Sequence, residues 1–83
     1  MSYKLLGFYK NSFDSTYLTA LFNEIQTRHP SITQSEIYNY QSSKASELNI
    51  TNYPCVMLYK DDTLHRKLDY KLNIKEAIGK LRL

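Results

Sequence analysis

Several residue types are scarce in this chain, and each scarcity narrows the possible functions. The 83 residues include one cysteine, Cys55, no tryptophan, and only two glycines and two prolines. A single cysteine excludes both a disulfide within the chain and a pair of thiols for redox cycling or zinc binding. The composition, 42% hydrophobic and 23% charged, is typical of a globular domain and not of a disordered chain. We therefore expect one compact domain spanning residues 1–83, with a small core and no large cofactor cavity.

Long apolar runs are missing as well. The N-terminal residues through Phe8 form too short an apolar stretch for a signal peptide, and no later run reaches the length of a membrane span. The formal net charge is +3, but eight acidic residues are interspersed among eleven basic ones. This balance favours solubility over nucleic-acid binding. We expect a cytoplasmic protein that does not contact membranes.

Hydrophobic periodicity predicts a long helix in the first half of the chain. Apolar residues between positions 18 and 25 recur at the spacing of one helix face. We expect Ser12 or Asp14 to cap the start of this helix, because their side-chain oxygens can accept from its first N–H groups. Pro30 should end it near His29, because a proline disfavours helical geometry at the residue before it.

The remaining elements are four strands, a short helix and a terminal helix. Runs rich in aromatic and β-branched residues predict the strands, and Asp61-Asp62 fits a two-residue turn between the last two. Asn73, with Glu76 three residues later, resembles a capping box at the start of the terminal helix. This order predicts an α/β fold, a mixed four-stranded sheet with helices on both faces. The expected strands are 3–9, 36–40, 55–60 and 64–70, and the expected helices are 14–29, 42–48 and 73–81.

Pro54 opens an otherwise strand-like apolar run. A proline has no N–H to donate to a sheet, so Pro54 should stand at the first residue of its strand. The passage from Asn39 to Cys55, with the strand that follows, resembles the cis-proline region of the thioredoxin superfamily, where Cys55 replaces the usual threonine. The resemblance implies the minimal thioredoxin-like fold, as in glutaredoxins, arranged βαβ-α-ββα. It also implies a cis peptide bond before Pro54.

The resemblance fails where thioredoxins perform redox chemistry. Residues 8–10 are similar to the family's Phe-Trp-Ala, which places residues 13–16 where a thioredoxin carries Cys-Gly-Pro-Cys. None of these four side chains can form the thiolate on which that chemistry depends. Gly7 replaces a buried acidic residue, Tyr70 replaces a glycine beside the binding groove, and Asp62 replaces a turn glycine. We expect no dithiol oxidoreductase activity, and a groove that is narrower and more aromatic than in an active enzyme.

The groove beside the proline is our candidate binding site. Tyrosine supplies rigid contact area and is enriched at binding hot spots, and exposed main chain beside a cis-proline can pair with an extended peptide. We expect a redox-inactive module that binds a protein or an extended peptide; a thioredoxin acting as a subunit of a phage DNA polymerase is a precedent. The composition also resembles that of small phage-encoded proteins. The candidate binding residues are Phe13, Asp14, Asn52, Tyr53, Pro54, Cys55 and Tyr70.

Two alternative functions remain. A monothiol oxidoreductase or thiol-transfer protein would use Cys55, although free cysteines are usually buried and inert without a nearby cation or helix N-terminus. A nucleic-acid accessory protein would use the basic C-terminal helix, although Glu76 interrupts its cations and no recognised nucleic-acid motif is present. His29 and His65 have no metal-ligand spacing to each other or to Cys55. We expect no metal and no cofactor.

Overall fold

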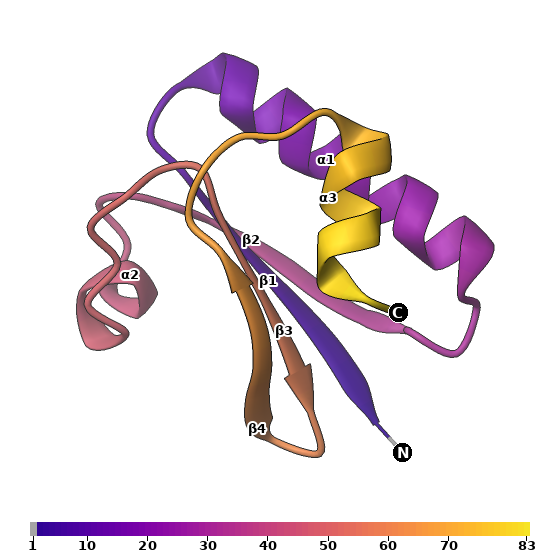
Figure 1. Cartoon of the computed structure of the whole chain (residues 1–83). Helices are drawn as coiled ribbons and strands as arrows, with labels where there is room; N and C mark the ends of the chain where they lie inside the picture. The colour runs from indigo at the N-terminus through magenta and orange to yellow at the C-terminus, as the bar shows by residue number, and fades with distance from the viewer. Residues whose placement is uncertain (1) are drawn as a thin grey trace.

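The computed structural model describes residues 2–83, and its seven elements follow the predicted order (Figure 1). No helix in this range is long and apolar enough to cross a membrane. The elements are β1 (Tyr3–Tyr9), α1 (Ser12–Arg28), β2 (Gln34–Asn39), α2 (Ser43–Glu47), β3 (Cys55–Lys60), β4 (Thr63–Leu68) and α3 (Ile74–Leu81).

The four strands form one mixed sheet in the order β2-β1-β3-β4. β1 runs parallel to β2, with an unbroken register from Lys4 opposite Gln34 to Tyr9 opposite Asn39. β3 is antiparallel to both β1 and β4. Parallel neighbours need a long crossover, which α1 supplies, whereas β3 and β4 are joined by a tight turn. The predicted α/β fold with a mixed four-stranded sheet is confirmed.

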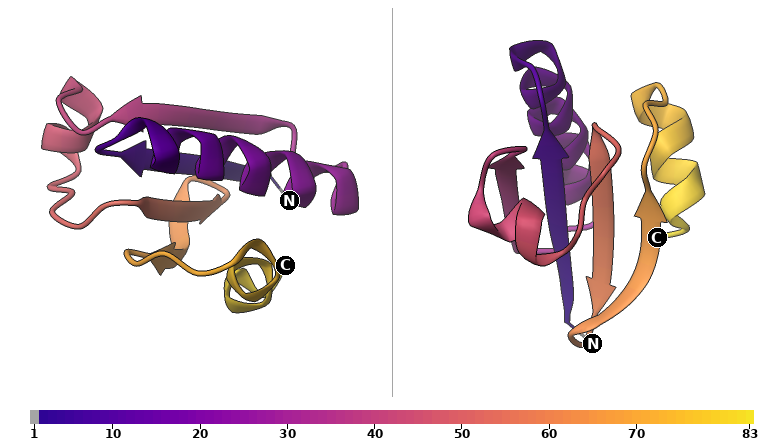
Figure 2. Two further views of the ribbon diagram at one scale, coloured as in Figure 1. Left: turned by 90° about the horizontal axis from the view of Figure 1, so that it is seen from above. Right: turned by 90° about the vertical axis from the view of Figure 1, so that its left-hand side faces the viewer.

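Helices cover both faces of the sheet (Figure 2). α1 and α3 pack on one face, where the core includes Leu5 and Leu58 from the sheet and Leu18 and Leu81 from the helices, each 0% exposed. The short α2 lies on the opposite face, over a smaller core that includes Phe8, Ala45 and Met57. Burying both faces explains why β1 and β3 read as continuous apolar runs and not as alternating ones.

The helix caps differ in part from the prediction. Asn11, not Ser12 or Asp14, caps α1, because its side-chain oxygen accepts from the Asp14 N–H at 2.9 Å. The prediction of Asn73 as the cap of α3 is confirmed, since its side chain accepts from the Glu76 N–H at 2.9 Å. The Glu76 carboxylate accepts from the Asn73 side-chain amide at 2.6 Å, so the return bond joins side chains and does not reach the cap's main-chain N–H.

Two strand boundaries also differ. β2 spans residues 34–39 instead of 36–40, and β4 ends at Leu68, which leaves Tyr70 outside the sheet. The register of β4 shifts between Leu58 and Tyr59 of β3, so the simple alternation expected for residues 64–70 does not hold. The turn at Asp61-Asp62 is confirmed, and both residues have positive φ, as a tight hairpin turn requires.

Candidate functional site

Three segments far apart in the sequence meet in one groove. They are the start of α1, the loop before β3 and the segment after β4, and together they enclose about 470 Å³. We call this hollow the Pro54 groove. Its lining residues are Lys10, Asn11, Asp14, Thr51, Asn52, Tyr53, Pro54, Asp69, Tyr70 and Lys71.

The loop before β3 presents free main chain to the groove. The Tyr53–Pro54 peptide bond is cis, and Thr51 and Asn52 are exposed. Among residues 2–83, none makes a hydrogen bond to the main-chain N–H or C=O groups of Thr51, Asn52 or Tyr53. These groups are therefore available to an incoming strand, because each main-chain donor and acceptor needs a partner once it loses water.

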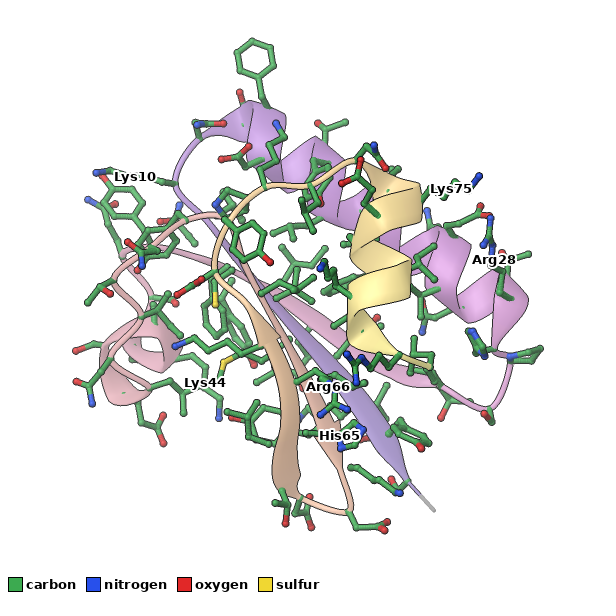
Figure 3. All side chains as sticks on the ribbon, viewed as in Figure 1. Lys10, Arg28, Lys44, His65, Arg66 and Lys75 are labelled. Carbon is green, nitrogen blue, oxygen red and sulfur yellow. The ribbon has the colours of Figure 1, made fainter. Side chains whose placement is uncertain are left out.

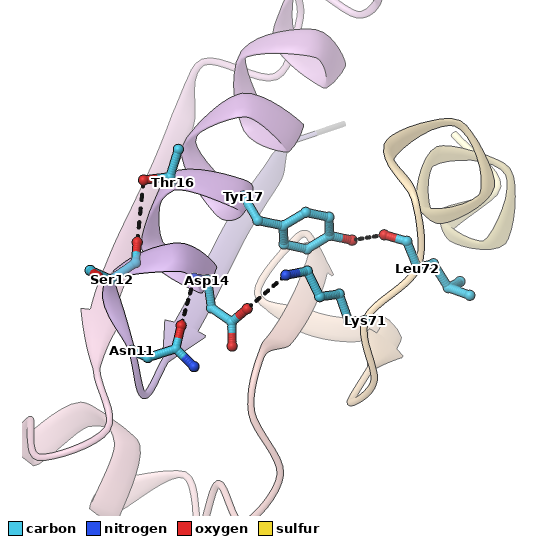
Figure 4. Close-up of polar contacts among 7 residues, drawn as sticks. All are labelled: Asn11, Ser12, Asp14, Thr16, Tyr17, Lys71 and Leu72. Atoms are coloured by element: carbon cyan, nitrogen blue, oxygen red, sulfur yellow. Dashed lines mark hydrogen bonds and ion pairs between the residues drawn. The ribbon is translucent and has the colours of Figure 1, made fainter.

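A buried carboxylate marks the opposite wall of the groove, at the start of α1. Asp14 is 7% exposed, and its carboxylate accepts from the Lys71 ammonium at 3.0 Å (Figure 4). A negative charge in the first turn of a helix is stabilised by the helix dipole. The ion pair therefore joins the segment after β4 to the N-terminus of α1.

Tyr17 strengthens the same junction. Its hydroxyl donates to the Leu72 carbonyl, and the Lys71 ammonium lies 5.2 Å from the centre of its ring (Figure 4). Burial raises the pKa of Tyr17, and the hydrogen bond to Leu72 and the nearby Lys71 charge oppose this shift. The phenol therefore stays protonated and remains a donor at neutral pH.

Further contacts hold the loop before β3 in place. The Asn52 side chain donates to the Asp69 carboxylate at 3.4 Å and so links two walls of the groove. The Tyr53 ring meets the Tyr40 ring edge-on, with centroids 6.2 Å apart. The Lys10 ammonium lies 5.6 Å from the centre of the Tyr40 ring, at the outer end of this cluster (Figure 3). These contacts fix the walls without filling the groove.

Solved structures of low sequence identity share the fold of this chain. A protein described as a malarial protein aligns over 99% of this chain and 96% of its own, with a TM-score of 0.78 and 15% identity. Fasciola hepatica thioredoxin aligns over 98% and 80%, with a TM-score of 0.73 and 11% identity. A chain from the complex of ferredoxin:thioredoxin reductase with thioredoxin f2 aligns over 98% of this chain and 76% of its own, with a TM-score of 0.74 and 15% identity. Neither a protein-family model nor a curated protein sequence matches the chain. The chain has the thioredoxin fold.

This thioredoxin fold lacks the two-cysteine motif, because Cys55 is its one cysteine. The Cys55 side chain is 0% exposed and belongs to the core under α2, with Phe8 and Met57. Burial raises the pKa of the Cys55 thiol from 9.0 to about 11; Lys67 opposes this shift and Asp69 adds to it. A thiol in this setting is protonated and inaccessible at neutral pH.

The groove brings together most of the predicted site residues. Five of them line it: Asp14, Asn52, Tyr53, Pro54 and Tyr70. Cys55 follows Pro54 directly, but it lies in the core instead of the groove. Phe13 is also outside the lining and is 81% exposed.

Several lining residues were missed by the sequence analysis, chiefly Asn11 and Lys71. Asparagine is as strong a helix cap as serine or aspartate, so the sequence could have predicted Asn11 as the cap of α1. Lys71 lies 57 positions after Asp14 in the sequence. Sequence patterns indicate contacts between residues a few positions apart, and none predicts an ion pair across so long a separation. The ion pair follows from the fold and was not predictable from spacing.

The core leaves no room for a side chain at Gly7. A Cβ atom at position 7 would lie 2.9 Å from Phe22 Cζ and 3.2 Å from Leu18 Cδ1. Phe22 is 2% exposed and cannot swing into solvent. The Phe22 ring occupies the space that a side chain at position 7 would need.

Metal ligands do not assemble among residues 2–83. No group of three or more histidine, cysteine, aspartate or glutamate side chains is placed to hold an ion there.

The groove itself carries two ammonium groups, from Lys10 and Lys71, and two carboxylates, from Asp14 and Asp69. Its charges balance, so the groove favours neither anions nor cations as a class.

Proposed function

We propose that this thioredoxin-fold chain is a redox-inactive binding module of the cytoplasm that holds an extended segment of a partner protein in the Pro54 groove. The observation that carries the proposal is the free main chain of Thr51, Asn52 and Tyr53 beside the groove. An extended segment lying along this loop would hydrogen-bond to it as an added strand does.

The side chains around the free main chain support the same mode. Tyr70 is 51% exposed and Tyr53 is partly buried, so each offers ring surface to a bound chain. Aromatic rings supply large contact area and lose little conformational entropy on binding. The balanced charges give no basis for recognising a highly charged ligand. A polar main chain flanked by apolar side chains is therefore the ligand that fits.

The test is selection from a displayed library of random linear peptides, with three versions of the protein. Tyr70→Ala removes a groove ring, and Leu64→Ala removes a side chain of similar exposure, 44%, on β4 outside the groove. We expect the wild type and Leu64→Ala to enrich the same peptides and Tyr70→Ala to lose them. For an enriched peptide, hydrogen exchange should slow at amides in the loop from Thr51 to Tyr53.

Two results would count against this mode. If no peptide is enriched, or if Tyr70→Ala enriches the same peptides as the wild type, the groove is not the binding site. If peptides bind but the loop amides exchange at an unchanged rate, the contact does not use strand addition. Circular dichroism of each variant separates loss of binding from loss of folding.

The alternative function, thiol chemistry at Cys55, has less support. The thiol is buried, and the pKa of about 11 leaves about a hundredth of the thiolate that an ordinary cysteine with a pKa of 9.0 would have at neutral pH. We expect iodoacetamide to alkylate Cys55 in the folded protein far more slowly than in urea. Rapid alkylation of the folded protein below pH 8 would favour the enzyme instead.

A further inference from the structure

The two edges of the sheet are protected to different degrees. β4 carries three consecutive basic side chains, His65, Arg66 and Lys67, together with a register shift. Figure 3 labels the first two. Cationic side chains and bulges are the usual devices that keep an edge strand from pairing. β2, at the other edge, has neither a bulge, a proline, a lysine nor an arginine over its six residues.

The main chain of β2 points outward at alternate residues. The Tyr40 N–H donates to the Tyr9 carbonyl at 2.8 Å. This bond shows that the main-chain groups of Tyr40 point toward β1. Since N–H and C=O groups alternate sides along a strand, residues with even numbers face β1, and Ser35, Ile37 and Asn39 face away. The Asn39 carbonyl also accepts from the Ser42 N–H at 3.0 Å, whereas the outward groups of Ser35 and Ile37 have no partner among residues 2–83.

We propose that β2 is a self-association edge, which pairs antiparallel with β2 of a second copy about a two-fold axis at Ile37. In this register Ile37 faces its own copy, and Ser35 faces Asn39 of the second copy. The outward groups on one strand then meet the outward groups on the other. Six hydrogen bonds join the two strands. Four of them use main-chain groups that have no other partner, and in the other two the Asn39 carbonyl, which already accepts from Ser42, accepts a second hydrogen bond.

Charge selects this register over its neighbour. A shift of the two-fold axis to Glu36 would place two glutamates directly opposite each other, which is destabilising. With the axis at Ile37, Glu36 instead faces Tyr38 of the second copy. Glu36 already pairs with Lys4 at 3.1 Å on its own chain, so no like charges meet across the seam.

On the face that α1 covers, there is room for this pairing. α1 lies over β1 and not over the outer side of β2 (Figure 2). In the proposed dimer the two α1 helices are separated by three strand spacings, about 14 Å. Packed helices approach to about 8–10 Å, so the two α1 helices do not collide. The interface is one strand wide, and a concentration-dependent dimer is therefore expected.

The test combines oligomeric state with a register-specific crosslink. Sedimentation of the wild type from micromolar to millimolar concentration should show the mass rising toward twice that of the monomer. Ser35→Pro removes an outward N–H and places a ring at the seam but leaves the bonds to β1 intact, so it should remain monomeric. Ser35→Ala keeps the N–H and should dimerise like the wild type. Circular dichroism checks that each variant folds.

Cysteine variants then test the register itself. Ile37→Cys places two thiols across a hydrogen-bonded pair with Cα atoms about 5.5 Å apart, within disulfide range, and oxidised glutathione should crosslink it. Ser35→Cys places its thiols about 14 Å apart and should not crosslink. A wild type that stays monomeric throughout overturns the proposal. So does a dimer in which Ser35→Cys crosslinks as well as Ile37→Cys, or in which Ser35→Pro has no effect.

Discussion

Raising the pH above 9 should weaken the fold through Cys55. The thiol has a pKa of 9.0 in an unfolded chain and about 11 in the folded core, because burial penalises the thiolate. As the pH rises past 9, the unfolded state releases this proton while the folded state retains it. The folded state then binds more protons, so stability falls with pH in this window.

The magnitude follows from the size of the shift. Each unit of pKa difference corresponds to about 1.4 kcal/mol, so the difference from 9.0 to about 11 is worth about 2.7 kcal/mol. This contribution is fully present below pH 9 and is lost as the pH reaches 11. A variant that removes the thiol isolates the Cys55 contribution.

Cys55→Ala is that variant. Its cavity lowers the free energy of unfolding by an amount that does not depend on pH. We expect the wild type to lose about 2 kcal/mol relative to Cys55→Ala between pH 9 and pH 11, measured by urea unfolding with far-ultraviolet circular dichroism and a reductant. A difference that stays constant over this range would show that Cys55 titrates equally in both states. The thiol would then be accessible, and the case against its chemistry would fail.

Three further substitutions test the packing and electrostatics near the site. Gly7→Ala places a methyl group 2.9 Å from the buried Phe22 ring and should lower the free energy of unfolding by about 1–3 kcal/mol. Gly79→Ala is its matched control, because no atom lies within 4 Å of the new methyl group, and it should raise the free energy of unfolding by about 0.5–1 kcal/mol; equal effects of the two would contradict the packing argument. Asp14→Asn removes the charge that faces Lys71 and the α1 dipole, and should cost about 1 kcal/mol at low salt. Urea unfolding measures all three, and an Asp14→Asn protein as stable as the wild type would show that the ion pair contributes nothing.

The strand after the proline was the most predictable element, although Pro54 stands one residue before it and not at its first residue as expected. Cys55 to Lys60 was expected as a strand and is β3. The apolar run, the proline before it and the Asp61-Asp62 turn after it all indicate the same strand. At β4 they disagree, since the register shift near Tyr59 breaks the alternation that the sequence indicated. Such a shift depends on pairing with a neighbouring strand and has no local signature.

The exposure of Phe13 could be read from the helix periodicity. α1 begins at Ser12, so Phe13 and Asp14 both lie in its first turn, about 100° apart around the axis. The buried face of α1 contains Leu18, Leu21 and Ile25, and counting back four residues from Leu18 reaches Asp14. Periodicity therefore assigns Asp14 to the inner face and Phe13 to solvent.

The two proposed surfaces are separable by experiment, because they share no residue. The Pro54 groove is lined by the start of α1, the loop before β3 and the segment after β4, and β2 contributes nothing to it. The self-association edge uses the outward groups of Ser35, Ile37 and Asn39 alone. Tyr70→Ala should therefore leave the dimer unchanged, and Ser35→Pro should leave peptide selection unchanged. If either variant affected both properties, the groove and the edge would be coupled through β1, which pairs with β2 along its whole length and leads directly into α1.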